Sequence, residues 1–351
     1  MADATTDDAH TPDSRADDTQ SAGPLEPAPL LKRIRWGGTK LGSLLGKDLG
    51  EGTDWAESWE VADHGEDQSV MIAGPYAGWP LAQLVAERPK ELFGRHAKKP
   101  NGSPRTQFPL LIKFLDAADT LSVQVHPNDE QAVTYDPTEN GKTEAWVIVD
   151  AEPGATLYAG LKPGTDADAL RAASEAGTVA DLLHQFEVQA GDCVFIPAGT
   201  VHAIGAGIVL AEIQQSSDLT FRLYDWGYRD PQGNPREIHL DESIACTDFA
   251  RGPVDPVVPG PLTGPSDASE RLVAGEYFVI DRHHGESPFP LRSDDRFHVL
   301  MTLVGSAELT GAGDPIALRP GKTALVPAAC EQLTIEPGPE GVTLLDSYLP
   351  G

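Results

Sequence analysis

Short apolar runs separated by glycine, proline and aspartate make up most of the chain after residue 108. Runs of this kind, bounded by turn-forming residues, predict β-strands rather than helices. Two earlier strands are predicted at residues 30–38 and 57–61, and further short strands follow between residues 272 and 349. The strands predicted in the central region are 110–114, 121–125, 145–149, 194–196 and 208–213.

Helical spacing of apolar residues occurs in two places. Residues 80–87 show it, with a further helix continuing to residue 92, and the alanine-rich segment 166–183 shows it as an insertion between strands. The segment 94–106 is basic and is predicted to be a loop. The pattern therefore indicates a mainly β protein of barrel-like domains with a few inserted helices.

Two segments of the chain resemble each other. Residues 320–332 overlay residues 190–202, with a shared glycine and a shared Pro-Ala pair at matching places. Where the earlier copy has His202, the later copy has Gln332. An internal repeat predicts two related barrels, and the loss of the histidine predicts that the second barrel has no metal.

Composition changes along the chain suggest four parts. Residues 1–25 have almost no large apolar side chains, so we expect a disordered acidic tail. A catalytic domain with helical insertions is expected over residues 26–250, and a second, metal-less β domain over 267–351. The proline-rich segment 251–266 is interpreted as the linker between them.

The overall charge and cysteine content narrow the function classes. A formal net charge of −28 argues against nucleic acid or an anionic membrane as a partner. No apolar run reaches the roughly 18 residues that span a bilayer, and no secretory signal is evident at the N-terminus. Three widely spaced cysteines do not form a disulfide framework, so a cytoplasmic location is expected.

Three segments offer candidate metal ligands. Alternation along a strand puts Ser122, Gln124 and His126 on one face, and Lys142 and Glu144 on one face of another strand. His202 follows a Pro-x-Gly-x-x turn, which would aim its imidazole across the barrel. Taken singly, Gln124, His126 and Glu144 would more often be ordinary strand residues, whereas the turn before His202 favours a role as a metal ligand. Together, Gln124, His126, Glu144 and His202 form a mixed N and O set that suits Zn²⁺, with Mn²⁺, Fe²⁺ or Co²⁺ as alternatives.

A fourth segment, residues 212–226, carries further polar side chains. Alternation puts Glu212 and Gln214 on one face, and Arg222 on a face with Thr220 and Tyr224. A solvated amphipathic hairpin explains this pattern. A functional interpretation instead places the Arg222 guanidinium in the pocket, where it could hold a phosphate or a developing oxyanion.

These motifs resemble a known family. The spacing from Gly191 through Pro197 and Gly199 to His202 matches the second cupin motif, although Ala206 stands where an asparagine often closes it. Gln-x-His at 124–126, Lys-x-Glu at 142–144 and the stretch 215–222 together resemble type I mannose-6-phosphate isomerase. The resemblance runs from about residue 25 to 349 and is densest between 108 and 244.

The resemblance implies a zinc-dependent isomerase with a jelly-roll cupin fold that interconverts mannose 6-phosphate and fructose 6-phosphate. Gln124, His126, Glu144 and His202 fall on the family's metal ligands, and Arg222 falls on its active-site arginine. Two departures are visible: Thr143 replaces a common proline, and Ile204 replaces the tyrosine of eukaryotic members. The chain is thus more similar to the compact bacterial subgroup.

Isomerisation of this kind moves a proton between C1 and C2 through a cis-enediol, so a base must reach both carbons. Lys142 and Glu212 are the two candidates, and the residues leave the choice open. Ser122, Lys142 or Arg222 would hold the phosphate of a small-molecule sugar phosphate. Two other functions compete: a sugar-phosphate-binding cupin without catalysis, and an Fe²⁺-dependent cupin oxygenase, which would more often present a His-x-His strand.

Overall fold

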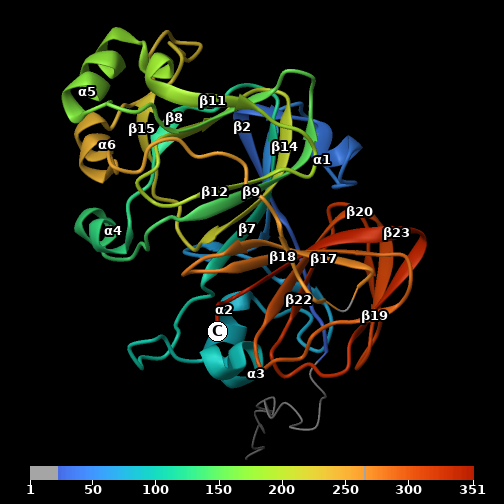
Figure 1. Cartoon of the computed structure of the whole chain (residues 1–351). Helices are drawn as coiled ribbons and strands as arrows, with labels where there is room; N and C mark the ends of the chain where they lie inside the picture. The colour runs from blue at the N-terminus through green and yellow to red at the C-terminus, as the bar shows by residue number, and fades with distance from the viewer. Residues whose placement is uncertain (1–22, 265) are drawn as a thin grey trace, which may run out of the picture.

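The computed structural model describes residues 23–264 and 266–351, and they form a mainly β structure. Two antiparallel sheets enclose a first barrel, and a third sheet forms a second barrel beside it (Figure 1). The expected acidic tail lies outside the described residues as far as residue 22. Leu25, which we placed at its end, is instead fully buried and pairs with Leu325 of the second barrel. In the described part of the chain, no helix is long and apolar enough to cross a membrane.

The first sheet of the first barrel has six strands, among them all the central ones predicted from apolar runs except 121–125. Every residue of its strand Leu110–Ala117 is buried, which explains the near-continuous apolar run there. In sheet order the strands are β12 (Cys193–Ile196), β9 (Glu144–Ala151), β14 (Ile208–Gln215), β7 (Leu110–Ala117), β3 (Trp55–Val61) and β2 (Leu30–Gly38).

The second sheet has five strands and closes the barrel over the first. The predicted strand 121–125 belongs here, shortened to three residues. In sheet order the strands are β11 (Leu183–Glu187), β10 (Thr156–Leu161), β13 (His202–Ile204), β8 (Val123–Val125) and β15 (Phe221–Tyr224). Two small sheets pair β1 (Glu26–Pro27) with β6 (Met71–Ala73) and β4 (Asp63–His64) with β5 (Asp67–Gln68).

The helices are short and lie outside the sheets. The predicted helical segments 80–87 and up to 92 are confirmed as α2 (Leu81–Glu87) and α3 (Pro89–Phe93). The predicted helix 166–183 is shorter, because Gly177 ends α5 (Ala167–Ala176) in the left-handed conformation, with φ of 74°. The others are α1 (Lys40–Ser43), α4 (Asp129–Tyr135), α6 (Leu240–Cys246) and the 3₁₀ turns η1 (Gly94–His96) and η2 (Val179–Leu182).

The second barrel is one sheet of eight strands. We expected only short strands here, but β20 (His298–Thr310) and β23 (Thr334–Tyr348) have 13 and 15 residues. Gly305, which reads as a turn signal, lies instead at a register shift within β20, so the strand continues through it. The remaining strands are β16 (Gly260–Pro261), β17 (Ala268–Ala274), β18 (Val279–Gly285), β19 (Phe289–Pro290), β21 (Ile316–Leu318) and β22 (Thr323–Val326).

The internal repeat is visible in the backbone. Strand β22 follows β12 at an offset of 130 residues, and Gly191 and Gly321 both have positive φ, 93° and 79°. β12 pairs with β9 so that Ile196 faces Glu144, and β22 pairs with β20 so that Val326 faces His298. His298 therefore takes the place of Glu144 in the second barrel. Gln332, which takes the place of His202, is exposed and has φ of 56°.

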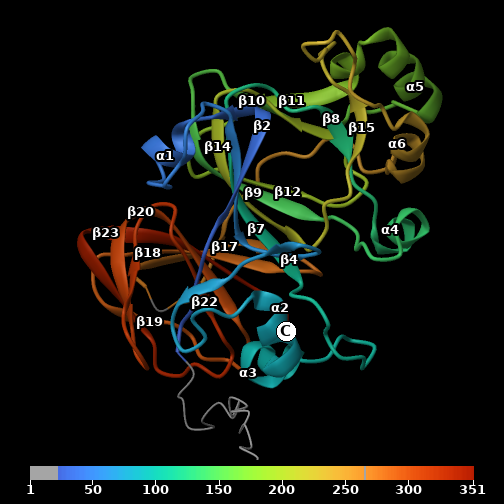
Figure 2. The same cartoon turned by 180° about the vertical axis from the view of Figure 1, so that it is seen from behind.

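The two barrels share a hydrophobic core. The ring of Phe297 in the second barrel lies 4.7 Å from Phe108 and 6.0 Å from Phe93, centroid to centroid. α2 and α3 lie beside the second barrel, whereas α4, α5 and α6 flank the far side of the first (Figures 1 and 2). The segment interpreted as a linker also follows the first barrel, since the Val257 amide donates to the Cys193 carbonyl at 2.7 Å. The domain boundaries at residues 250 and 266 stay a prediction.

The second barrel buries its own charged cluster. Nδ1 of His298 lies 2.8 Å from Asp346, and its Nε2 lies 3.3 Å from Asp294. Nε2 of a second histidine, His283, lies 3.9 Å from Asp346. Burial alone would lower the pKa of His298, but Asp346 and Asp294 together raise it to about 9. His298 is therefore an imidazolium at neutral pH.

We expect His298 to make stability depend on pH in the alkaline range. Because its pKa rises from an ordinary 6.5 to about 9, its contribution is complete below about pH 6.5 and is lost as pH passes 9. The contribution is on the order of 3 kcal/mol. Urea unfolding of the wild type and His298→Gln should show a large stability gap at pH 6 that narrows by pH 10. A gap independent of pH would contradict the assignment.

Candidate functional site

Two imidazoles and one carboxylate meet inside the first barrel. One ligand atom from each of His126, Glu144 and His202 lies within 4.8 Å of the other two, and all three side chains are buried. His202 begins β13, Glu144 begins β9, and His126 directly follows β8. The register of the sheets thus brings together three strand ends that are far apart in the sequence.

The backbone orients both imidazoles. Nδ1 of His126 lies 3.0 Å from the carbonyl oxygen of Leu219, and Nδ1 of His202 lies 2.9 Å from that of Thr200. A carbonyl only accepts, so each Nδ1 carries the proton and each Nε2 turns a lone pair inward. On the inner side, Nε2 of His126 and of His202 lie 3.5 and 3.3 Å from the Glu144 carboxylate.

Burial sets the protonation of these side chains. It lowers the pKa of His202 to about 4, and with Lys142 and His202 nearby it lowers that of His126 well below 6.5. Burial also raises the pKa of Glu144 to about 7, although Lys142 opposes the shift. Neutral imidazoles beside a carboxylate are what a divalent cation requires, and among the residues that the structure describes, Nε2 of His202 has no hydrogen-bond partner. The donor set therefore fits a metal ion.

Gln124 lies directly opposite His202 on one side and Arg222 on the other, in the register of β13, β8 and β15. Side chains of directly opposite residues share a face of the sheet, so these three point the same way. Nε of Arg222 donates to Oγ of Ser122 at 3.3 Å, and its Nη1 donates to the carbonyl oxygen of Glu237 at 2.9 Å. Gln124, His202 and Arg222 thus form one row across this sheet.

Lys142 lies against the cluster. Its Nζ is 2.8 Å from Oε2 of Glu144 and 3.1 Å from Nε2 of His126. The other candidate base, Glu212, is buried. It lies two residues before Gln214, which is directly opposite Glu144 in the sheet. Nε1 of Trp146 donates to Glu212 at 3.1 Å. Burial would raise the pKa of Glu212, but Lys142 and Lys113 lower it below its usual value, so it is ionised.

Sequence reasoning missed Lys113. Its Nζ lies 3.4 Å from Glu57 and 3.5 Å from Glu212, and the side chain is buried in the middle of β7. Glu57 and Glu212 raise the pKa of Lys113 although burial lowers it, so the ammonium is charged. The one signal in the sequence was a single lysine within the apolar run 110–114.

The fold and these side chains define a cupin protein whose first barrel contains a candidate metal centre. Residues 28–152 match the family model described as phosphomannose isomerase type I, catalytic domain. The chain is 35% identical over 298 residues to a mannose-6-phosphate isomerase of Streptococcus mutans, covering 85% of this chain and 90% of that one. It is 33% identical to mannose-6-phosphate isomerase ManA of Bacillus subtilis, covering 89% and 96%.

Structural comparison agrees. The crystal structure of mannose 6-phosphate isomerase from Bacillus subtilis superposes with a TM-score of 0.83 at 29% identity, over 94% of this chain and 100% of that one. Because such similarity extends over nearly the whole length, this chain belongs to the type I phosphomannose isomerase family. The family and the cupin fold implied by the sequence motifs are confirmed.

The Lys113 network makes a testable contribution to stability. Lys113→Met would leave buried Glu212 and half-buried Glu57 without their shared cation, and breaking a buried ion pair in this way costs about 3–5 kcal/mol. Denaturant unfolding should show this loss. The control is Lys162→Met, at an exposed lysine, for which a change within about 0.5 kcal/mol is expected. A loss below about 1 kcal/mol for Lys113→Met would show that the network is not a stabilising ion pair.

Proposed function

We propose that this chain is a metal-dependent isomerase that interconverts mannose 6-phosphate and fructose 6-phosphate. The observation that carries the proposal is the meeting of His126, Glu144 and His202 beside Lys142 inside a barrel of this family. A small-molecule sugar phosphate is thus the expected partner.

We propose Gln124, His126, Glu144 and His202 as the ligands of one Zn²⁺. The mixture of imidazole, carboxylate and amide donors suits zinc, and the ordered Nδ1 contacts keep both imidazoles in the tautomer that binds metal. When bound, the cation would polarise the oxygens on C1 and C2 of the sugar as a Lewis acid.

The proton transfer between C1 and C2 falls to Lys142 and Glu212. Glu212 is ionised and held in place by Trp146 and Lys113, so it is ready to accept a proton. Lys142 lies against the imidazole of His126, where its ammonium can donate to a sugar oxygen or stabilise the enediolate. We propose both as catalytic residues.

Arg222 and Ser122 are proposed to bind and orient the sugar phosphate. Two of the Arg222 nitrogens already donate to Ser122 and to the backbone of Glu237, which fixes the plane of the guanidinium. Burial, together with nearby Arg236, lowers the pKa of Arg222, but a guanidinium stays charged at neutral pH. A fixed cation on the same face as Gln124 can hold the phosphate or the developing negative charge.

A coupled assay tests this function against the binding cupin and the Fe²⁺ oxygenase. Purified protein should form fructose 6-phosphate from mannose 6-phosphate, a chelator should abolish the activity, and added Zn²⁺ should restore it. Binding of the sugar phosphate without turnover would support the non-catalytic cupin. Oxygen uptake without isomerisation would support the oxygenase.

Variants test the residue roles. Arg222→Ala and Lys142→Ala should each lower kcat by about 10²- to 10³-fold, because each removes a cation aimed at charge that develops in the transition state. Both should keep near-normal zinc content, measured by elemental analysis. Arg319→Ala, at an exposed arginine in the second barrel, is the control. If both site variants keep zinc and near-normal kcat, the active-site assignment is wrong.

We also propose that the protein works in the cytoplasm. Cys193, Cys246 and Cys330 are all free and buried, which suits a reducing compartment. Fractionation of the producing cells, followed by detection with an antibody, would test the location.

A further inference from the structure

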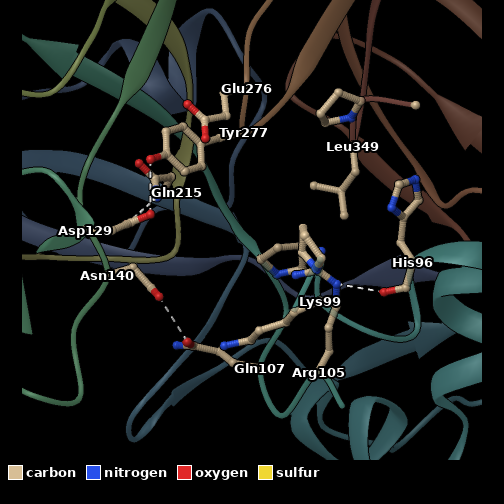
Figure 3. A pocket seen from close by; sticks show the side chains of 14 residues that line it. His96, Lys99, Arg105, Gln107, Asp129, Asn140, Gln215, Glu276, Tyr277 and Leu349 are labelled. Atoms are coloured by element: carbon tan, nitrogen blue, oxygen red, sulfur yellow. Dashed lines mark hydrogen bonds between the residues drawn. The ribbon is translucent and has the colours of Figure 1, made fainter. Parts of the chain in front are cut away.

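A cavity of about 470 Å³ lies outside the barrel interior, where three distant parts of the chain meet. The loop after α3 lines one side with His96, Lys99 and Arg105, and segments at the edge of the first barrel line the opposite side (Figure 3). The second barrel contributes Tyr277 and the segment 349–351. Ligand pockets in proteins usually measure about 300–1,000 Å³, so this cavity is large enough for a small metabolite.

One side of the cavity is positively charged. Nε of Arg105 donates to the carbonyl oxygen of His96 at 2.8 Å, but within the described residues neither Arg105 nor Lys99 forms an ion pair. Burial lowers the pKa of His96, and Arg95 and Arg105 lower it further, as expected in a positive local field. A cluster of cations without ion-pair partners is unexpected in a chain of net charge −28. Keeping the protein soluble does not explain it, because the excess of acidic residues already does that.

The opposite side offers hydrogen-bonding groups together with the carboxylates of Asp129 and Glu276, which can accept from the hydroxyls of a ligand. Asp129 accepts from the Gly141 amide at 2.8 Å, from Gln215 Nε2 at 2.9 Å and from the Tyr277 hydroxyl at 3.0 Å. Its carboxylate is therefore held in place. Asn140, whose Nδ2 donates to the carbonyl oxygen of Ser216 at 2.8 Å, completes this wall beside the ring of Tyr277 (Figure 3).

We propose that this cavity is a second ligand site, separate from the barrel interior, for a phosphate ester such as a sugar phosphate or a nucleotide. Arg105 and Lys99 hold the phosphate, because a guanidinium with free N–H groups binds phosphate oxygens in pairs. The sugar or base lies against the ring of Tyr277 and the amide of Asn140. The volume of the cavity and the cations along one of its sides support this class of ligand.

The wall of this cavity is connected to the candidate catalytic strand. Oε1 of Gln215 accepts from the backbone amide of Thr143 at 3.0 Å, and Thr143 stands between Lys142 and Glu144. A ligand against Asn140 and Gln215 therefore touches the back of the segment that carries both residues. Binding should slow hydrogen exchange of the backbone amides in residues 95–107 and 139–143.

Calorimetry on the full chain tests the site with inorganic phosphate, glucose 6-phosphate and AMP as probes. At least one should bind, and the order of affinities shows whether the phosphate alone, the sugar or the base contributes. The double variant Lys99→Gln/Arg105→Gln should weaken binding by about tenfold or more, which corresponds to about 1.4 kcal/mol. Lys162→Gln/Arg319→Gln removes the same charge at two exposed positions and should change the affinity less than about twofold.

The readout is independent of isomerase activity, so its failure and that of the proposed function are distinguishable. Arg222→Ala, which alters the barrel interior, should leave this binding in place. The exposed Lys99→Gln alone serves as a second variant if the double variant does not fold. Absence of binding by all three probes at millimolar concentration would overturn the proposal. So would binding that the Lys99 and Arg105 variants leave unchanged, or binding that Arg222→Ala abolishes.

Discussion

The charge balance inside the first barrel is the constraint on which the site depends. The carboxylates of Glu57, Glu144 and Glu212 face the ammonium groups of Lys113 and Lys142, so negative charge exceeds positive charge by one. Buried carboxylates are costly without a counter-charge. Burial, with a further contribution from the nearby Glu212 carboxylate, raises the pKa of Glu144, and a bound divalent cation would favour its charged form. The excess of carboxylates over ammonium groups inside this barrel therefore favours the binding of a metal cation.

The second barrel meets the same problem in another way. At the position of Glu144 in the paired strands it has His298, and the imidazolium is held between Asp294 and Asp346. In the second barrel a side chain thus supplies the positive charge that a bound metal ion would supply in the first. The two barrels share this strand pairing, but they carry side chains of opposite charge, Glu144 and His298, at the equivalent position.

Strand alternation predicted much of the site, because it depends only on neighbouring residues. It grouped Lys142 with Glu144 and drew attention to His126, while the Pro-x-Gly-x-x turn drew attention to His202, and the structure brings these four together. Lys113 escaped prediction because its partners lie on other strands, and one lysine in an apolar run is ambiguous. The long β20 was missed because the glycine of a bulge looks like the glycine of a turn.

The cavity near Arg105 was beyond sequence reasoning for a related reason. The basic loop was recognised, but nothing local indicates that it faces Asn140 and Tyr277. Such juxtapositions arise only when the two barrels have packed around Phe93, Phe108 and Phe297.

The pairing of Leu25 with Leu325 has a consequence for how the protein is made. These partners are separated by about 300 residues, so the segment at Leu25 cannot form this pairing until Leu325 has been synthesised. Until then the apolar surface around Phe93 and Phe108 stays exposed on the nascent chain. The second barrel thus closes over a segment made about 300 residues earlier, so the two barrels cannot be fully packed until the second has been synthesised.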